Sequence, residues 1–273
     1  MNNVVISIAT LIAYFGSATL IGWRLFTHQP DTSTARLRGV TLGLAYAGLT
    51  LHTWLLYMVL FSQAGLNLGF FNALSLAAWT VVASLLLSSL NKPIENLGLV
   101  VLPLAGLSVL LDMFYPSMPF LAENTSWVLK LHVLLSMLAY SLLTLASLQA
   151  GLLWIQDSYL RGRKPGGFVR ALPPLMTMEA LMFEMIGIGF ILLTLALLSG
   201  FAFLDNMFAQ HVVHKTVLSV VAWLVFGGLL LGRRLWGWRG RKAISWTLTG
   251  FGILILAYFG SKLVLEFILN PPA

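Results

Sequence analysis

The sequence predicts an all-α protein, a polytopic transmembrane helix bundle of about eight spans. Hydrophobic residues make up 59% of the 273 residues, and charged residues only 9%. A soluble globular protein carries roughly 25% charged residues, so this chain has too few to cover a surface that faces water. The apolar residues also fall into continuous segments of about 20 residues, the length that one membrane crossing requires.

Each of these segments is expected to be a helix, because a segment in lipid must satisfy its backbone hydrogen bonds internally. The alternation of polar and apolar residues that is typical of a membrane β-barrel is absent from the sequence. The fourth span is short and contains Pro103. The expected spans are Val4–Trp23, Gly39–Ser62, Leu68–Leu90, Leu97–Tyr115, Trp127–Ile155, Ala180–Leu204, Val213–Leu231 and Ala243–Leu269.

Lysine and arginine predict the orientation of the bundle. All of the 16 basic residues except Lys130, Lys215 and Lys262 lie in or beside the odd-numbered connections between spans. Cytoplasmic connections carry such an excess, so both termini are expected to face outward, into the periplasm. The net charge of +7 is spread over short clusters and forms no long basic stripe. The expected partner is therefore the lipid bilayer and not a nucleic acid.

Several kinds of chemistry are excluded by what the sequence lacks. It contains no cysteine, so it forms no disulfide and attaches no haem covalently through Cys-x-x-Cys-His. It also has no Gly-x-Ser-x-Gly, Walker or His-Glu-x-x-His motif. These absences favour a protein with no catalytic residues of its own.

Two histidines within the expected spans are candidate ligands. His52 lies in the second span and His132 lies a turn or two inside the outer end of the fifth. Ionisable side chains are costly in a membrane and usually face the interior of a bundle. Neutral imidazole is a good iron ligand, so the two residues are candidates for holding haem. The alternative is that each forms a hydrogen bond between helices.

A second pair, His211 and His214, lies at the outer start of the seventh span. Residues three apart share one face of a helix, so this pair is a weaker candidate for metal binding. We favour an interfacial pair in contact with water, because a zinc site requires further ligands that this stretch does not provide.

Several stretches together resemble one known family. The segment Leu131–Tyr140 is similar to a family helix with a histidine followed by Ala-Tyr. The tail is similar to a Lys-x-x-x-x-x-x-x-Trp helix, a basic Gly-Trp-x-Gly loop and a final Tyr-Phe-Gly helix, and the third-span region Leu66–Trp79 also matches. Over most of its length the chain resembles the CcsA-type cytochrome c assembly membrane proteins, and most nearly their short YpjD/HemX-like branch. The tail elements read here as Lys215–Trp223, Gly237–Gly240 and Tyr258–Gly260.

The resemblance implies a single transmembrane cytochrome c assembly-like domain over residues 1–273, located in the bacterial inner membrane. It implies a non-covalent, b-type haem handled on the outer side of that membrane. His132 occupies the position of an outward haem-iron ligand, and His52 matches a histidine usual in the second span of the short branch. Partners implied by the family are cytochrome c maturation proteins or other membrane proteins.

The sequence also departs from the family pattern. Full assembly proteins carry a tryptophan-rich outer loop that presents haem, but the matching stretch Asp205–Lys215 contains no tryptophan. The family histidine near the inner end of the seventh span is replaced by Leu231 or Gly232, and the histidine late in the eighth is absent. These departures argue against a complete haem ligase. His211 or His214 is a candidate to substitute as the second outer ligand, and His52 is a candidate second ligand or a polar neighbour of the haem.

The sequence and the resemblance leave three functions open. In the first, the protein binds or relays haem in support of cytochrome c maturation and makes no covalent bond itself. In the second, it is a haem-independent scaffold or regulator of haem synthesis or of partner stability. The third, a transporter of small solutes or metal ions, is the least favoured, because an ion pathway requires buried charge that this chain lacks.

Overall fold

The computed structural model describes residues 2–27, 31–60, 70–115, 127–162, 169, 172–203 and 213–260, and among them it contains helices and no strands. The predicted all-α class is therefore confirmed. The helices are α1 (Asn2–Thr27), α2 (Asp31–Leu60), α3 (Phe70–Ser89), η1 (Glu95–Leu97), α4 (Gly98–Phe114), α5 (Trp127–Arg161), α6 (Leu175–Phe203), α7 (Val213–Trp236), α8 (Gly240–Ile255) and the π-helical η3 (Leu256–Gly260).

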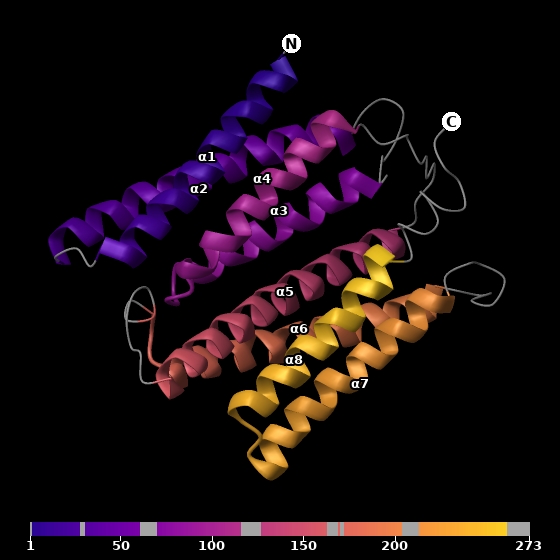
Figure 1. The fold of residues 1–273 in the computed structure, drawn as a ribbon. Coiled ribbons are helices and arrows are strands. Elements are labelled where there is room, and N and C mark those ends of the chain that lie inside the picture. Colours follow the sequence, from indigo (N-terminus) through magenta and orange to yellow (C-terminus); the bar gives the residue numbers. More distant parts are fainter. Residues whose placement is uncertain are drawn as a thin grey trace. The chain divides into compact units, whose positions relative to one another are not determined.

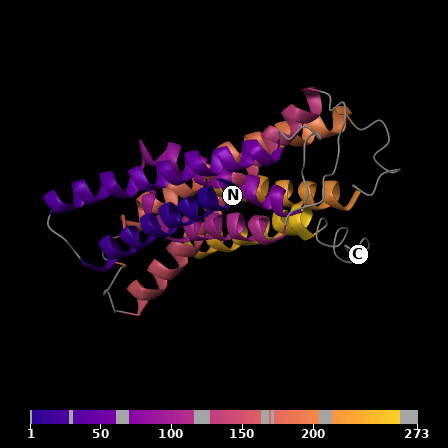
Figure 2. The same cartoon turned by 90° about the horizontal axis from the view of Figure 1, so that it is seen from above.

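Contacts between the helices divide the chain into two compact units. Unit 1 is Met1–Asn124 with Arg163–Pro173, and unit 2 is Thr125–Gly162 with Pro174–Ala273. In unit 1, α1 to α4 each contact the next helix and α4 contacts α1; in unit 2, α5 to α8 form the same closed ring. The helices of each unit run alongside one another (Figures 1 and 2). Each unit is thus a four-helix bundle, and the single domain expected over the chain stays a prediction.

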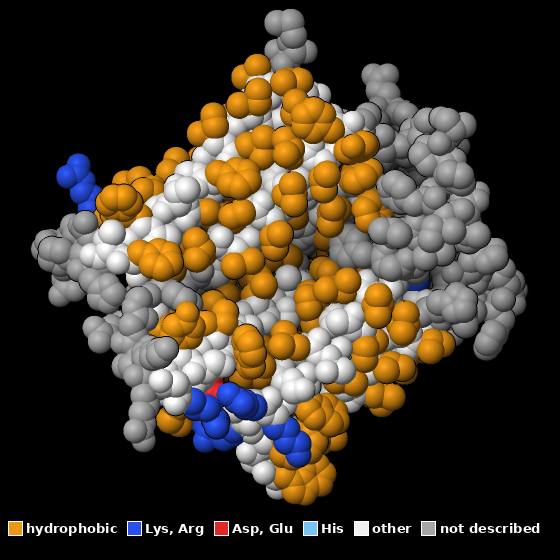
Figure 3. Space-filling view, viewed as in Figure 1, with side chains coloured by type: hydrophobic (Ala, Val, Ile, Leu, Met, Phe, Trp, Pro, Cys, Tyr) orange, Lys and Arg blue, Asp and Glu red, His pale blue; other side chains and the backbone are white. Residues whose placement is uncertain are grey.

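Large apolar side chains lie on the surface of each bundle as well as in its core. Tyr14 and Leu85 are buried inside unit 1, and Phe226 is buried inside unit 2. On the outside, Leu87 in unit 1 is 69% exposed and Ile191 in unit 2 is 60% exposed. Figure 3 shows hydrophobic side chains spread over this face of the molecule. Such a surface is stable in hydrocarbon and not in water, so the chain is a multi-pass membrane protein.

Seven of the helices in the described part of the chain are long and apolar enough to cross a membrane, from α1 through α7. The predicted number was about eight. The difference lies in α8, whose 16 residues continue directly into η3, while the remainder of the expected span to Leu269 lies outside the described residues.

Two helices begin earlier than the apolar pattern predicted. The expected second span starts at Gly39, whereas α2 starts at Asp31, and the expected sixth span starts at Ala180, whereas α6 starts at Leu175. Hydropathy marks the part of a helix that lies in hydrocarbon, and it does not mark the turns that continue into the polar interface. The predicted spans therefore start inside helices that begin one to two turns earlier.

Candidate functional site

His132 lies on α5 and contacts α6 within unit 2. Its Nδ1 atom is 2.9 Å from the main-chain oxygen of Ala196 and 3.0 Å from Oγ of Ser199. A carbonyl oxygen can only accept a hydrogen bond, so Nδ1 carries the proton and donates. The hydroxyl of Ser199 donates in turn to the oxygen of Ala196, at 2.8 Å. The serine oxygen therefore also accepts from the imidazole.

This bonding fixes the tautomer of the neutral ring. With the proton on Nδ1, the other nitrogen, Nε2, has a free lone pair and no hydrogen-bond partner among the described residues. A metal-binding histidine usually donates its second ring nitrogen to a carbonyl or carboxylate, which orients the ring and raises its basicity. His132 has this arrangement, and its side chain is only partly buried.

The close approach of His132 to α6 depends on a glycine. A Cβ atom added at Gly200 would lie 3.1 Å from Cε1 of His132 and 3.5 Å from its Nδ1. Gly200 therefore leaves room for the imidazole against the helix, and Ser199 beside it supplies the hydroxyl. Neither Ser199 nor Gly200 was predicted from the sequence. The signal was present as a Ser-Gly pair near the end of an otherwise apolar helix.

His52 has a different environment, in the centre of unit 1. Its side chain is fully buried, with 0% exposure. Nδ1 lies 3.1 Å from the hydroxyl oxygen of Tyr14 on α1, and Nε2 lies 2.9 Å from Oγ of Ser75 on α3. In a neutral imidazole one nitrogen donates and the other accepts, so both nitrogens are satisfied by hydroxyl groups. His52 thus connects three helices.

Tyr14 reaches His52 because α2 carries a glycine one turn earlier. A Cβ atom added at Gly48 would lie 2.6 Å from Cδ1 of the Tyr14 ring. The rings of Tyr14 and His52 meet edge to face, with centroids 5.9 Å apart. Neither Tyr14 nor Ser75 was identified from the sequence, because a single tyrosine or serine in an apolar segment has no spacing pattern that points to its partner.

The two histidines therefore differ in whether a ring nitrogen is available to bind haem iron. A ligand to iron needs one free ring nitrogen, which His132 has, whereas His52 would first have to release Tyr14 or Ser75. Two cavities are described, of about 210 Å³ beside Ser75 and about 70 Å³ in unit 2. Sites for drug-sized ligands measure about 300–1,000 Å³, so neither cavity has room for haem. His132 lines neither of these cavities, and its side chain is partly exposed.

The other pair of candidate ligands is only partly described. His211 lies outside the described residues, and of His214 the structure gives only its place at the start of α7. Among the residues that are described, no group of three or more His, Asp and Glu side chains could hold a metal ion. Metal binding by His211 and His214 stays a prediction.

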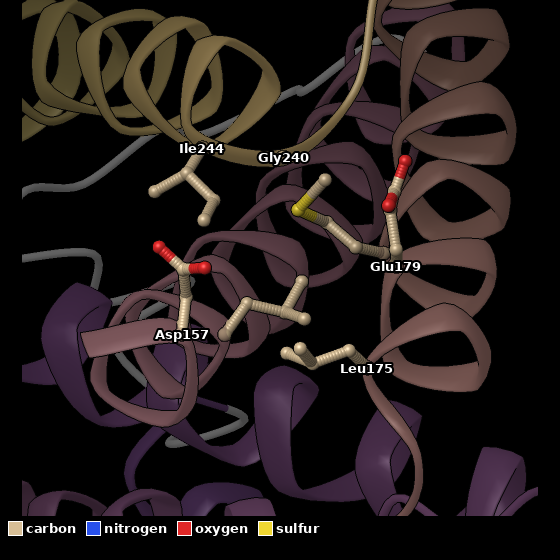
Figure 4. A pocket seen from close by; sticks show the side chains of 7 residues that line it. Asp157, Leu175, Glu179, Gly240 and Ile244 are labelled. Carbon is tan, nitrogen blue, oxygen red and sulfur yellow. The ribbon is translucent and has the colours of Figure 1, made fainter. Parts of the chain in front are cut away.

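The smaller cavity lies at the basic end of unit 2. It is lined by Asp157 on α5, Glu179 on α6, and Gly240 and Ile244 on α8. Both carboxylates point toward the start of α8 (Figure 4). Asp157 pairs with Arg241 at 2.9 Å and Glu179 with Arg239 at 3.2 Å. These ion pairs connect the start of α8 to α5 and α6. The cavity therefore lies among contacts that hold helices together.

Comparisons with known proteins identify a family that matches most of the chain. A sequence model of the family described as "Cytochrome C assembly protein" matches residues 43–269, a range that contains both His52 and His132. The chain is 36% identical over 217 residues to "Inner membrane protein YpjD" of Escherichia coli (strain K12), covering 76% of this chain and 78% of that protein. It is 26% identical over 302 residues to "Cytochrome c biogenesis protein CcsA" of Thermosynechococcus vestitus, covering 93% and 90%.

A further relative is similar over its whole length. It is the "Uncharacterized 28.8 kDa protein in nifR3-like 5'region" of Azospirillum brasilense, 29% identical over 278 residues, covering 98% of this chain and 99% of that protein.

Proposed function

We propose that this chain, which belongs to the cytochrome c assembly protein family, holds haem non-covalently through His132 and supports cytochrome c maturation. The family and the relatives named YpjD and CcsA support a role in cytochrome c biogenesis in the inner membrane. The finer assignment, to a haem-binding or haem-relaying protein without covalent chemistry, is the proposal. Its partners would be the bilayer and other cytochrome c maturation proteins.

The observation that carries the proposal is the orientation of His132. The bond from Nδ1 to the oxygen of Ala196 leaves Nε2 free on a partly exposed side chain. When bound, haem would supply an iron that takes imidazole nitrogen as a ligand, and Nε2 of His132 is the atom that would hold it. The chain's contribution would be to orient this nitrogen. It has no cysteine to bond covalently to haem.

His52 receives a different role in this proposal. Both of its nitrogens are hydrogen-bonded inside unit 1, so it holds α1, α2 and α3 together. We therefore assign it as a buried structural histidine and not as the second iron ligand. A second ligand to the iron would come from another group of this chain, such as His211 or His214, or from a partner.

One observation favours the second candidate function, a haem-independent scaffold. The stretch Asp205–Lys215, where full assembly proteins carry tryptophans, contains none. A scaffold would use the same buried hydrogen bonds at His52 to keep its fold, and it would need no free nitrogen at His132.

Spectroscopy of the purified protein separates these functions. The full chain in mild detergent, as isolated and after addition of haemin, should show a Soret band and sharp α and β bands on reduction. His132→Ala should lose these bands, whereas His52→Ala should keep them in whatever fraction remains folded. Ser136→Ala, on the same helix and only partly buried, serves as the control for a change that leaves the imidazole in place. A colourless wild type that takes up no haemin would exclude the haem-binding function and favour the scaffold.

A further inference from the structure

The turn between α7 and α8 gathers five basic residues, only two of which pair with a carboxylate in the described part of the chain. Arg239 and Arg241 have carboxylate partners in α6 and α5. In the described part of the chain, Arg233, Arg234 and Lys242 have no such partner. The guanidinium of Arg233 lies 3.7 Å from the ring centre of Phe183, and its Nη1 atom is buried without a described hydrogen-bond partner.

Aromatic rings support these cations. Nζ of Lys242 lies 3.6 Å from the ring centre of Trp238. Trp238 packs against Trp236 and Trp246, with ring centroids 5.8 Å and 5.0 Å apart. Tryptophan is enriched at the level of the lipid head groups, where its apolar ring and polar nitrogen face different surroundings. The cluster therefore indicates the depth at which this turn meets the membrane surface.

The backbone of the turn holds the cluster in one arrangement. Gly237 has φ of 64° and Gly240 has φ of 57°, which are left-handed conformations that favour glycine. The Trp238 ring lies directly over Gly232 on α7, where an added Cβ atom would come within 2.3 Å of it. The main-chain nitrogen of Trp238 also donates to the oxygen of Gly232, at 3.2 Å. These backbone conformations and contacts hold the basic and aromatic side chains of the turn in one arrangement.

An apolar strip continues from this cluster along α7. Leu231, Leu235 and Trp236 are 57%, 64% and 68% exposed. Figure 3 shows Lys and Arg side chains beside hydrophobic ones at the end of unit 2 where α7 turns into α8. A ligand that fits both features has a negative head group and a long apolar chain.

We propose that the α7–α8 turn binds an anionic phospholipid, with the phosphate beside Arg233, Arg234 and Lys242 and an acyl chain along Leu231, Leu235 and Trp236. Unpaired cations at the cytoplasmic face of a membrane protein attract acidic head groups, and the positive-inside pattern places this turn at that face. A free phosphate ion would use the cations but not the exposed strip. This site is independent of haem and lies at the opposite end of the predicted spans from His132.

Native mass spectrometry of the full chain tests the site. The protein would be released from detergent after incubation with phosphatidylglycerol or with phosphatidylcholine, and the retained lipid counted. Wild type should retain phosphatidylglycerol in preference. Arg234→Gln and Lys242→Gln should each weaken this retention by about fivefold, the effect expected of one basic residue near an anionic surface. The double variant should retain the two lipids equally.

Arg36→Gln is the matched control, because Arg36 is an exposed basic residue of unit 1 on the same predicted side of the membrane. It removes the same charge and should leave retention unchanged. The proposal would be overturned if Arg36→Gln lost as much phosphatidylglycerol as the site variants, or if the double variant retained as much as wild type. Complete displacement of the lipid by excess inorganic phosphate would also overturn it. The thermal unfolding of each variant without added lipid shows that it is folded.

Discussion

Nδ1 of His132 lies 2.9 Å from the main-chain oxygen of Ala196, which leaves the opposite nitrogen of the ring without a described partner. In His52 both nitrogens have hydroxyl partners. Residue type alone makes both histidines candidate iron ligands, and the contacts around them support the proposal that His132 binds haem and His52 is structural.

Ser199→Ala tests the orientation of His132. The substitution removes the oxygen 3.0 Å from Nδ1 but leaves the carbonyl of Ala196 in place. Losing one such hydrogen bond costs about 0.5–1.5 kcal/mol, so haem affinity should fall by about tenfold or less. A titration of the protein with haemin, followed at the Soret band, measures this. Ser136→Ala on α5 is a suitable comparison, and a loss as large as that of His132→Ala would contradict the expected support role.

Tyr14→Phe tests the structural role of His52. It deletes the hydroxyl 3.1 Å from Nδ1 and leaves a buried ring nitrogen unpaired. An unsatisfied buried polar group costs about 1–3 kcal/mol, so the apparent Tm in detergent should fall while haem uptake by folded protein stays unchanged. Tyr115→Phe is the control, since Tyr115 lies in the same unit and is 59% exposed. Loss of the haem bands in Tyr14→Phe at full stability would show instead that His52 serves the haem.

Gly48→Ala should destabilise unit 1, because the new Cβ atom would come within 2.6 Å of the Tyr14 ring. Overpacking of this kind typically costs about 1–3 kcal/mol. Gly43 on the same helix has nothing within 4 Å of an added Cβ atom. Gly43→Ala should therefore be neutral or stabilise the helix, by up to about 1 kcal/mol. Thermal unfolding of the two variants side by side checks the packing, and equal Tm values would refute it.

Glu95→Gln should weaken the basic end of unit 1. The carboxylate pairs with Arg24 at 3.3 Å and Arg38 at 2.9 Å, and its side chain is only 12% exposed. Removing its charge leaves two cations unpaired, at a cost of about 1–3 kcal/mol, between the values for exposed and buried pairs. Asp157→Asn offers a contrast, because its arginine partners are 64% and 55% exposed. Its effect should stay within about 1 kcal/mol.

The helical class and the positions of the spans followed from the sequence, because a bilayer imposes both helix length and apolar composition. Helix ends such as Asp31 and Leu175 did not, because a helix can continue beyond the hydrocarbon. The residues at His132 and His52 were identified as polar groups in apolar segments. Their partners Ser199, Tyr14 and Ser75 required the fold, since serine and tyrosine hydroxyls contact whichever helix packs against them.

Haem ligation by His132 is tested most directly by replacing its side chain with a free ligand. His132→Gly, purified in mild detergent with haemin, should lack the sharp reduced α and β bands. Addition of imidazole should restore them, because imidazole can enter the space that the side chain left and coordinate iron. Under the same conditions His52→Gly should keep its bands without imidazole. Bands that persist in His132→Gly, or that disappear in His52→Gly and return with imidazole, would contradict the assignment of His132 as the haem ligand.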